Sequence, residues 1–291
     1  MRLPDFLIIG GMKCGSTTLY RDLMTHPDVF FPIDKEPESL GSDHVLTEEG
    51  RAAYGALFAK AADHQLCAEA STGYTKLPDI TGAARRAREL IGADLRAIYV
   101  VREPVARIVS HHHHARSGGA DMPDDLLAAL DSSPELLNYT RYATQVAPWI
   151  EAFGADAIRI VRFEDYTKAR AETAAELSRF IGIDPKPELV QEDRVYNKSE
   201  AKPVVTGRWR LIQGNAVYRA VVRPLMSQAV RDRVRALILP KSKSERARVS
   251  ADIIHRVYDA LEGDLEALAG IMGSDGPVWN RETTLARYRD A

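Results

Sequence analysis

A lysine and three hydroxyl residues lie beside closely spaced glycines near the start of the sequence, where they could bind an anion. The segment follows an apolar run at 6–9 and reads Gly10-Gly11-Met12-Lys13-Cys14-Gly15-Ser16-Thr17-Thr18. A strand, a tight glycine turn and a hydroxyl-rich helix start direct backbone N–H groups and the positive end of a helix at a phosphate group. The pattern predicts a phosphate-binding loop in which Lys13 stabilises a departing, negatively charged group.

The order of residues in this loop separates it from a nucleoside-triphosphate loop. That loop requires Gly-x-x-x-x-Gly-Lys-Ser/Thr, whereas here Ser16 occupies the lysine position and Lys13 comes earlier. A kinase also needs a carboxylate for Mg²⁺ at a strand end, and the apolar run 95–101 ends instead at Arg102. A nucleotide or nucleoside kinase is therefore one alternative, and a non-catalytic anion-binding module is another.

A second basic element follows the strongest apolar run and reads Arg102-Glu103-Pro104-Val105-Ala106-Arg107-Ile108-Val109-Ser110. The arginine fork forms paired, charged hydrogen bonds with phosphate. The alternative for Arg107, on the intervening helix, is that it only pairs with Glu103 one helical turn earlier. The run 111–114 consists of four histidines, but no acidic or cysteine partner lies at a metal-ligand spacing. We expect a structural or cofactor-adjacent role for these histidines, and no metal.

Alternating apolar runs and helical patterns must position these two elements. Strands are predicted at 6–9, 65–68, 95–101 and 158–163, and helices at 16–24, 80–91, after Pro104, at 166–181 and at 251–272. Continuous apolar strands separated by helices are typical of a buried parallel sheet with helices on both faces. The sequence predicts one α/β domain over 1–291, with a core at 1–184 and a basic, mostly helical part at 185–291.

In their order along the chain, these motifs resemble those of the sulfotransferases that use 3′-phosphoadenosine-5′-phosphosulfate (PAPS). The likeness is closest to the heparan sulfate N- and 3-O-sulfotransferases and their bacterial relatives. The glycine loop resembles the family's 5′-phosphosulfate loop, and 102–110 its 3′-phosphate element R-x-P-x-x-R-x-x-S. Lys35-Glu36-Pro37 resembles the Lys-Glu pair that carries the catalytic base, and 69–74 resembles the segment G-E-x-S/T-P-x-Y.

The resemblance implies a P-loop-like sulfotransferase fold, PAPS as the cofactor without a metal, and in-line transfer of a sulfuryl group to a hydroxyl. Lys13 and Glu36 are then the catalytic residues. The implied cofactor-binding residues are Gly11, Lys13, Cys14, Gly15, Ser16, Thr17, Thr18, Arg102, Ser110 and Arg208. Glu69, Tyr74 and His114 are acceptor-side candidates, and Glu69 and His114 remain alternatives for the base. The part at 185–291 is expected to close over cofactor and acceptor.

Departures from the family pattern fall on positions that face the acceptor. Glu38 replaces a histidine, Ala70 replaces a lysine, and Ser39-Leu40 replaces an aromatic pair. We therefore expect a small metabolite or a carbohydrate as acceptor, and the heparan substrate is not carried over.

Composition sets wider limits on function. The 291-residue chain is 45% hydrophobic and has a formal net charge of −2, which gives no overall attraction to nucleic acid. Residues 198–248 nevertheless contain 13 Lys or Arg against 3 Asp or Glu, so that segment is strongly basic. Two cysteines and no long apolar run favour a cytoplasmic protein without membrane insertion. The sequence does not indicate an oligomeric state.

Overall fold

Five parallel strands form the centre of the structure, in the order β2-β3-β1-β4-β5. The structure is a computed structural model that describes residues 1–33, 35–192 and 247–289. The strands are β1 (Phe6–Gly10), β2 (Val29–Phe30), β3 (Leu66–Ala70), β4 (Arg96–Val101) and β5 (Ile158–Arg162). Because all five run in the same direction, the loops that follow β1, β3 and β4 meet at the carboxyl edge of the sheet, where ligands bind in such folds.

The central strands are apolar because both faces of the sheet are covered. The side chains of Phe6 to Ile9 in β1 and of Ile98 to Val101 in β4 have no solvent exposure. Ile8 pairs with Ala70 of β3 on one side and with Ile98 of β4 on the other. Four strands follow the predicted runs to within two residues, and the two-residue β2 lies between the first helix and Lys35.

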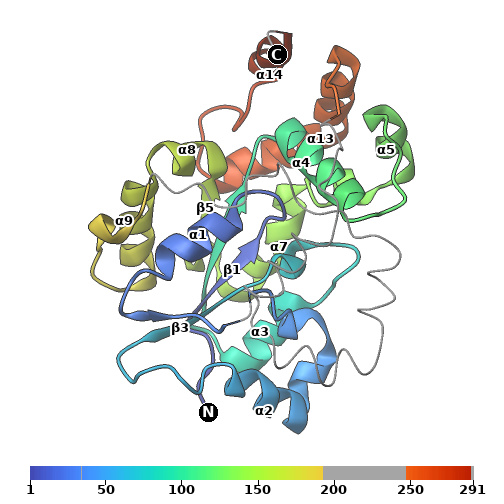
Figure 1. Ribbon diagram of the computed structural model, residues 1–291. Coiled ribbons are helices and arrows are strands. Elements are labelled where there is room, and N and C mark those ends of the chain that lie inside the picture. Colours follow the sequence, from blue (N-terminus) through green and yellow to red (C-terminus); the bar gives the residue numbers. More distant parts are fainter. Residues whose placement is uncertain (34, 193–246, 290–291) are drawn as a thin grey trace, which may run out of the picture.

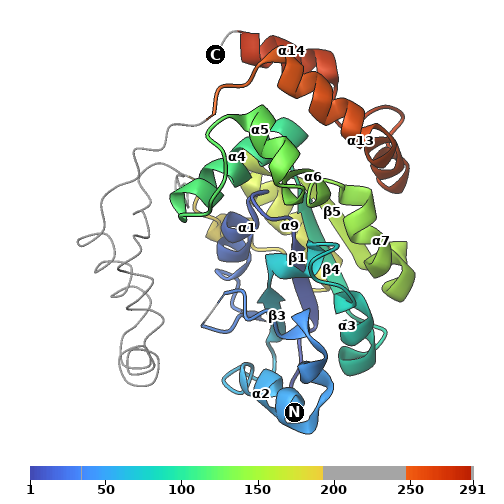
Figure 2. The same ribbon diagram turned by 90° about the vertical axis from the view of Figure 1, so that its right-hand side faces the viewer.

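Helices on both faces of the sheet connect the strands. The helices are α1 (Ser16–Leu23), α2 (Glu48–Ala56), α3 (Ala83–Ile91), α4 (Pro104–Ser117), α5 (Leu126–Ser132), α6 (Glu135–Asn138), α7 (Tyr142–Phe153), α8 (Phe163–Lys168), α9 (Arg170–Ile181), α13 (Ala251–Ile271) and α14 (Arg281–Arg289). In Figures 1 and 2, α1 and α9 lie together on one side of the sheet, and α3 and α7 lie together on the other. This doubly wound arrangement is the predicted α/β fold.

Short 3-10 turns occupy the loops near the carboxyl edge and elsewhere. They are η1 (Ser39–Gly41), η2 (Asp43–Leu46), η3 (Thr72–Thr75), η4 (Ala155–Ala157) and η5 (Pro187–Leu189). Beyond the core, α13 packs against α7 and α4, and Figure 2 shows α13 and α14 across the end of the molecule above α5. None of the described helices combines the length and apolar character that crossing a bilayer requires.

Two predicted helices differ from the structure in their bounds. The predicted helix 166–181 is divided into α8 and α9, because Ala169 leaves the helical conformation with a φ of −142°. The predicted helix 80–91 begins only at Ala83, after Gly82 with a left-handed φ of 74°. Both breaks depend on single backbone conformations that hydrophobic periodicity does not report.

Candidate active site

The glycine loop leaves β1 at the carboxyl edge of the sheet and continues directly into α1. The Gly11 amide donates to the Val100 carbonyl at 2.7 Å and fixes the loop to β4. Lys13 has a φ of 68°, a left-handed conformation that residues other than glycine rarely adopt. Gly15 follows with a φ of 92°, and a Cβ atom there would lie 2.5 Å from the Phe163 ring. Position 15 therefore requires glycine both for its backbone and for the space it leaves.

The first turn of α1 lacks the groups that neutralise other helix starts in the protein. Its N-cap residue, Gly15, makes no side-chain hydrogen bond, and the first turn contains no acidic residue. Side-chain oxygens cap α2, α4, α5 and α13, whereas α3 begins uncapped like α1, after Gly82. The backbone N–H groups of a helix start carry partial positive charge and have no partner within the helix. This end of α1, with the hydroxyls of Ser16, Thr17 and Thr18, fits an anionic group.

The structure places the Arg102 side chain against the backbone of Lys13. The Arg102 guanidinium donates from Nη1 to the Lys13 carbonyl at 3.1 Å. It also lies 4.6 Å from the centre of the Phe163 ring, a cation–π distance. Because Arg102 is only partly buried, its remaining N–H groups stay available to a ligand beside the loop.

Arg107 contacts the glycine loop from behind and does not pair with Glu103. Its side chain has no solvent exposure, and it donates to the Met12 carbonyl at 3.1 Å and to Thr140 Oγ1 at 2.9 Å. Glu103 instead caps α4 by accepting from the Val105 and Ala106 amides. The alternative of an Arg107–Glu103 pair is wrong, because the carboxylate is used at the helix start and the guanidinium spans toward the loop.

Cys14 and Tyr142 fill the space under the loop. The Cys14 thiol has no solvent exposure and lies 3.7 Å from the Tyr142 hydroxyl. Burial raises the pKa of Cys14 to about 11, so the thiol is neutral and unreactive at neutral pH. The Tyr142 hydroxyl also donates to the Arg102 carbonyl at 2.7 Å. The Cys14 thiol is therefore closed off from a ligand, and its amide donates to the Gly11 carbonyl at 3.1 Å. No sequence motif pointed to the role of Tyr142.

Helix α4 places Ser110 and the histidines at different depths. Ser110 is partly exposed in the middle of the helix, and among the described residues no hydrogen bond joins it to Arg102. His111 is buried, accepts from Arg107 Nη2 at Nδ1 over 3.1 Å, and stacks on Tyr139. Burial lowers the pKa of His111 to about 2, and the charges of Arg107 and Lys13 act in the same direction. His111 is therefore a neutral imidazole beside the cationic loop.

The remaining histidines of the run have separate surroundings. His112 is also buried, and its Nε2 lies 2.7 Å from the Pro123 carbonyl. His114 is partly exposed, and its charge contributes to the lowered pKa of His111. Among the described residues, no three His, Cys, Asp or Glu side chains are arranged to hold a metal ion.

Glu36 is the most accessible of the three candidate bases. Its backbone amide donates to the Ala70 carbonyl at 3.0 Å, which fixes it at the end of β3. The carboxylate is 39% exposed, and Lys35 Nζ lies 2.5 Å from its Oε1 atom. A carboxylate that is open to solvent yet held at the carboxyl edge of the sheet can accept a proton from a bound hydroxyl.

Glu69 and Tyr74 lie inside the protein and are not positioned to contact an acceptor. Glu69 has no solvent exposure, and Tyr74 is 3% exposed. The Tyr74 hydroxyl donates to Glu69 at 2.5 Å, and Tyr54 and Ser71 donate to the same carboxylate. The expected acceptor-side role does not fit this burial, because all the contacts of these two side chains are internal. The predicted cofactor contact Arg208 lies outside the described residues.

The fold is that of a P-loop-like α/β protein, with the glycine loop at the carboxyl edge of the sheet. Comparison with known proteins specifies the class further, because residues 82–206 match the family described as "Sulfotransferase domain". The chain is 26% identical over 213 residues to human heparan sulfate glucosamine 3-O-sulfotransferase 3B1, covering 69% of this chain and 51% of that protein. It is 25% identical over 255 residues to mouse heparan sulfate glucosamine 3-O-sulfotransferase 6, covering 82% and 70%.

Solved structures give the same fold. The sulfotransferase from Alicyclobacillus acidocaldarius superposes with a TM-score of 0.64 at 18% identity, covering 95% of this chain and 98% of that one. The sulfotransferase domain from the curacin biosynthetic pathway has a TM-score of 0.51 at 15% identity, covering 100% and 99%. Residues 82–206, less than half of the chain, thus match a sulfotransferase domain, and the curated proteins that the chain resembles are sulfotransferases. The chain spans about half the length of the first curated relatives that it matches.

Proposed function

We propose that this protein transfers a sulfuryl group from PAPS to a hydroxyl group of a carbohydrate or a small metabolite. The observation that carries the proposal is the contact between Arg102 and the glycine loop, because it brings two anion-binding elements to one edge of the sheet. PAPS has an anionic group at each of two positions, the 5′-phosphosulfate and the 3′-phosphate. The uncapped start of α1 and the partly exposed Arg102 guanidinium supply two matching positive sites.

Each group of the site has a role in this proposal. When bound, PAPS supplies the activated sulfuryl group on a phosphate leaving group. The loop amides and the hydroxyls of 16–18 hold the 5′ side, while Arg102 and Ser110 hold the 3′-phosphate. Lys13 stabilises the negative charge that develops on the leaving phosphate. Glu36 accepts the acceptor's hydroxyl proton at a carboxylate oxygen.

Binding of the desulfated product tests the cofactor. Titration calorimetry compares adenosine 3′,5′-bisphosphate with AMP and with ATP plus Mg²⁺. We expect the bisphosphate to bind without a metal and about 10-fold or more tightly than AMP, because charged hydrogen bonds to the 3′-phosphate are strong. Preference for ATP with Mg²⁺ would support a kinase instead, and absence of binding to all three would remove the cofactor assignment.

Replacement of Lys13 separates a catalyst from a binding module. Release of adenosine 3′,5′-bisphosphate from PAPS is measured with a panel of neutral sugars, sulfated oligosaccharides and simple alcohols as acceptors. We expect Lys13→Ala to lower kcat by about 100-fold or more, with a much smaller loss of bisphosphate affinity. Lys60→Ala is the control, because Lys60 is exposed and distant in sequence from Lys13. An equal loss in binding and turnover would contradict the leaving-group role.

The acceptor proposal rests on the residues beside Glu36. Glu38 Oε1 lies 3.7 Å from Lys76 Nζ, so this pair adds little net charge at a position where the chain departs from the expected family pattern. The curated relatives are named for a heparan sulfate glucosamine acceptor. A neutral sugar or alcohol fits a charge-balanced surface better than a polyanion does. Turnover with sulfated oligosaccharides alone would contradict this part of the proposal.

We also propose a reducing, cytoplasmic location for the protein. Both cysteines, Cys14 and Cys67, are free and buried thiols, which is usual where thiols stay reduced. Fractionation of cells that express the tagged chain, followed with compartment markers, tests the location. Recovery in a secretory fraction would reject it.

A further inference from the structure

The buried carboxylate of Glu69 is the centre of a hydrogen-bond cluster that the proposed reaction does not use directly. Glu69 lies next to the end of β3 and has no solvent exposure. Its Oε2 accepts from the Tyr54 hydroxyl at 2.5 Å, and its Oε1 accepts from Ser71 at 2.6 Å and from Tyr74 at 2.5 Å. Burial raises the pKa of Glu69, while the three hydroxyl donors act in the opposite direction.

Two of the three hydroxyls also accept hydrogen bonds from the loop that follows Glu36. The Glu38 amide donates to Ser71 Oγ at 3.1 Å, and the Leu40 amide donates to the Tyr74 hydroxyl at 3.1 Å. Each connection therefore runs from a loop N–H through a hydroxyl to the Glu69 carboxylate. Donors aligned in this way polarise and strengthen one another.

The loop needs such support because its backbone is strained. Glu36 has a φ of 63° and Glu38 a φ of 52°, and left-handed residues other than glycine persist only where the surroundings hold them. The Gly73 position shows how closely the loop lies over η3, since a Cβ atom there would be 2.6 Å from Glu38 Oε1. The loop thus packs directly against the segment 71–74, which contains two of the residues that bind Glu69.

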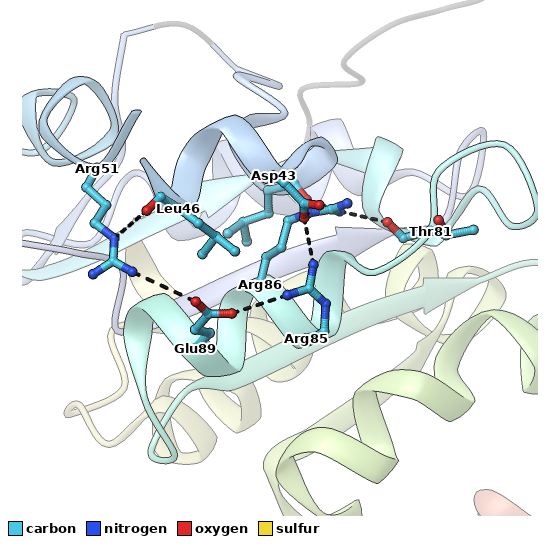
Figure 3. Close-up of polar contacts among 8 residues, drawn as sticks. Asp43, Leu46, Arg51, Thr81, Arg85, Arg86 and Glu89 are labelled. Atoms are coloured by element: carbon cyan, nitrogen blue, oxygen red, sulfur yellow. Dashed lines mark hydrogen bonds and ion pairs between the residues drawn. The ribbon is translucent and has the colours of Figure 1, made fainter. Parts of the chain in front are cut away.

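The outer side of the same loop is held by Arg86. Its Nη1 donates to the Leu40 carbonyl at 3.0 Å, and its Nε donates to Asp43 Oδ1 at 2.6 Å. Figure 3 shows Asp43 between the side chains of Arg85 and Arg86, with Thr81 on the far side of Arg86. Leu40 is therefore held at its amide by Tyr74 and at its carbonyl by Arg86.

We propose that Glu69 is a positioning residue for the reaction: through Ser71 and Tyr74 it holds the 36–40 loop so that Glu36 meets the acceptor hydroxyl. This inference rests on the proposed function, because it assigns Glu36 as the base. Glu69 itself touches neither acceptor nor cofactor. Loss of the Ser71 or the Tyr74 hydroxyl leaves the Glu36 carboxylate unchanged, but the loop can then move Glu36 away from the productive geometry.

Two tyrosines on the same carboxylate provide the test. Tyr74→Phe removes a donor to Glu69 and the acceptor of the Leu40 amide. Tyr54→Phe removes a donor of the same chemistry that connects Glu69 to α2 and not to the loop. We expect Tyr74→Phe to lower kcat for PAPS-dependent transfer by about 10-fold or more at unchanged affinity for adenosine 3′,5′-bisphosphate. Tyr54→Phe keeps kcat close to that of the unaltered protein, and Ser71→Ala behaves like Tyr74→Phe.

Amide hydrogen exchange of the 36–41 segment gives a second measurement that needs no activity. Exchange should accelerate in Tyr74→Phe and Ser71→Ala but not in Tyr54→Phe. Faster exchange with unchanged kcat, equal kcat losses in both tyrosine variants, or unchanged exchange in Tyr74→Phe would each overturn the inference. If the unaltered protein neither binds the bisphosphate nor turns over PAPS, the proposed function fails, and exchange alone decides whether the Ser71 and Tyr74 hydroxyls that bind Glu69 hold the loop.

Discussion

Directly behind the glycine loop, the charged Arg107 side chain contacts the neutral imidazole of His111. Arg107 is fully buried and donates to the Met12 carbonyl, so it supports the loop through the backbone. The same guanidinium donates to His111 Nδ1. Because arginine keeps its proton, Nδ1 of His111 must stay an acceptor. The imidazole is thereby fixed in its neutral form, with its proton on Nε2.

This arrangement predicts a loss of stability in mild acid. The folded-state pKa of His111 is lowered to about 2, whereas an unfolded histidine titrates near about 6.5. Below that pH the unfolded chain binds a proton that the folded protein does not, so the contribution of His111 to stability is present above about pH 6.5 and is lost as the pH falls. Between about pH 7.5 and about pH 5.5 the loss is about 1 kcal/mol.

Urea unfolding at the two pH values measures this effect. His111→Gln keeps an acceptor for Arg107 but cannot titrate. Over the same pH interval, the decrease in the free energy of unfolding should therefore be about 1 kcal/mol smaller in this variant than in the unaltered protein. His255→Gln, at an exposed histidine of α13, should retain the full pH dependence. Identical pH dependence in the unaltered protein and in His111→Gln would show that the imidazole is not held neutral.

Among the elements, α1 matters most for the site because it begins at the glycine loop. On its other side, α1 is fixed to α9 by a buried ion pair. Asp22 is 3% exposed, and Arg170 donates to it from Nη2 at 2.6 Å and from Nε at 3.0 Å. Tyr166 of α8 donates to the same carboxylate. The two helices on this face of the sheet are thus joined by charge as well as by packing.

Removal of the Asp22 charge should be strongly destabilising. Asp22→Asn removes the buried carboxylate charge that Arg170 contacts through two nitrogen atoms, and the free energy of unfolding should decrease by about 3 kcal/mol. Asp259→Asn is the matched control, because Asp259 is 65% exposed in its pair with Arg281. That change should cost less than about 1 kcal/mol. Equal losses in both variants, measured by urea unfolding, would contradict the importance of burial.

The same elements show how far the sequence could be interpreted. The strands around Ile8 and Ile98 were predictable because continuous apolar runs report burial on both faces. The glycine loop was predictable because its residue types are dictated by backbone conformation and by anion binding. The cluster around Glu69 was not, since Tyr54 lies on another element and no spacing rule connects the two. The role of Arg107 was missed for a similar reason, because its partners come from residues about 30 and 95 positions away.

At the scale of the whole molecule, the described C-terminal helices are joined to the α/β core by buried polar contacts. Tyr258 of α13 donates to Glu103 at the start of α4. Trp279 donates from its indole N–H to Glu164 at 3.2 Å, and Glu164 accepts from the Glu103 amide at 2.8 Å. The residues that flank Arg102 therefore depend on α13 and on the chain after it. The division at residue 184 and the closing role of 185–291 stay predictions, since 193–246 lies outside the described residues.

The strongest of these long-range links is Asp264, which lies on α13 and caps α7. Its carboxylate accepts from the Ala143 amide at 3.0 Å, from the Thr144 amide at 2.9 Å and from the Thr144 hydroxyl at 2.7 Å. A side chain about 120 residues away thus satisfies the start of a core helix. If the C-terminal helices and the core form one cooperative unit, loss of this cap destabilises the whole unit and not α13 alone.

Asp264→Ala should therefore lower the free energy of unfolding by about 2 kcal/mol. Urea unfolding followed by far-ultraviolet circular dichroism and by tryptophan fluorescence should give coincident transitions, because Trp149 of α7 and Trp279 after α13 unfold together with the helices. Asp275→Ala, at an exposed aspartate just beyond α13, should leave the transition unchanged. An early loss of helical signal ahead of the fluorescence change would mean that the C-terminal helices unfold separately. In that case the hydrogen bond between Glu103 and Glu164, next to Arg102, would not depend on α13.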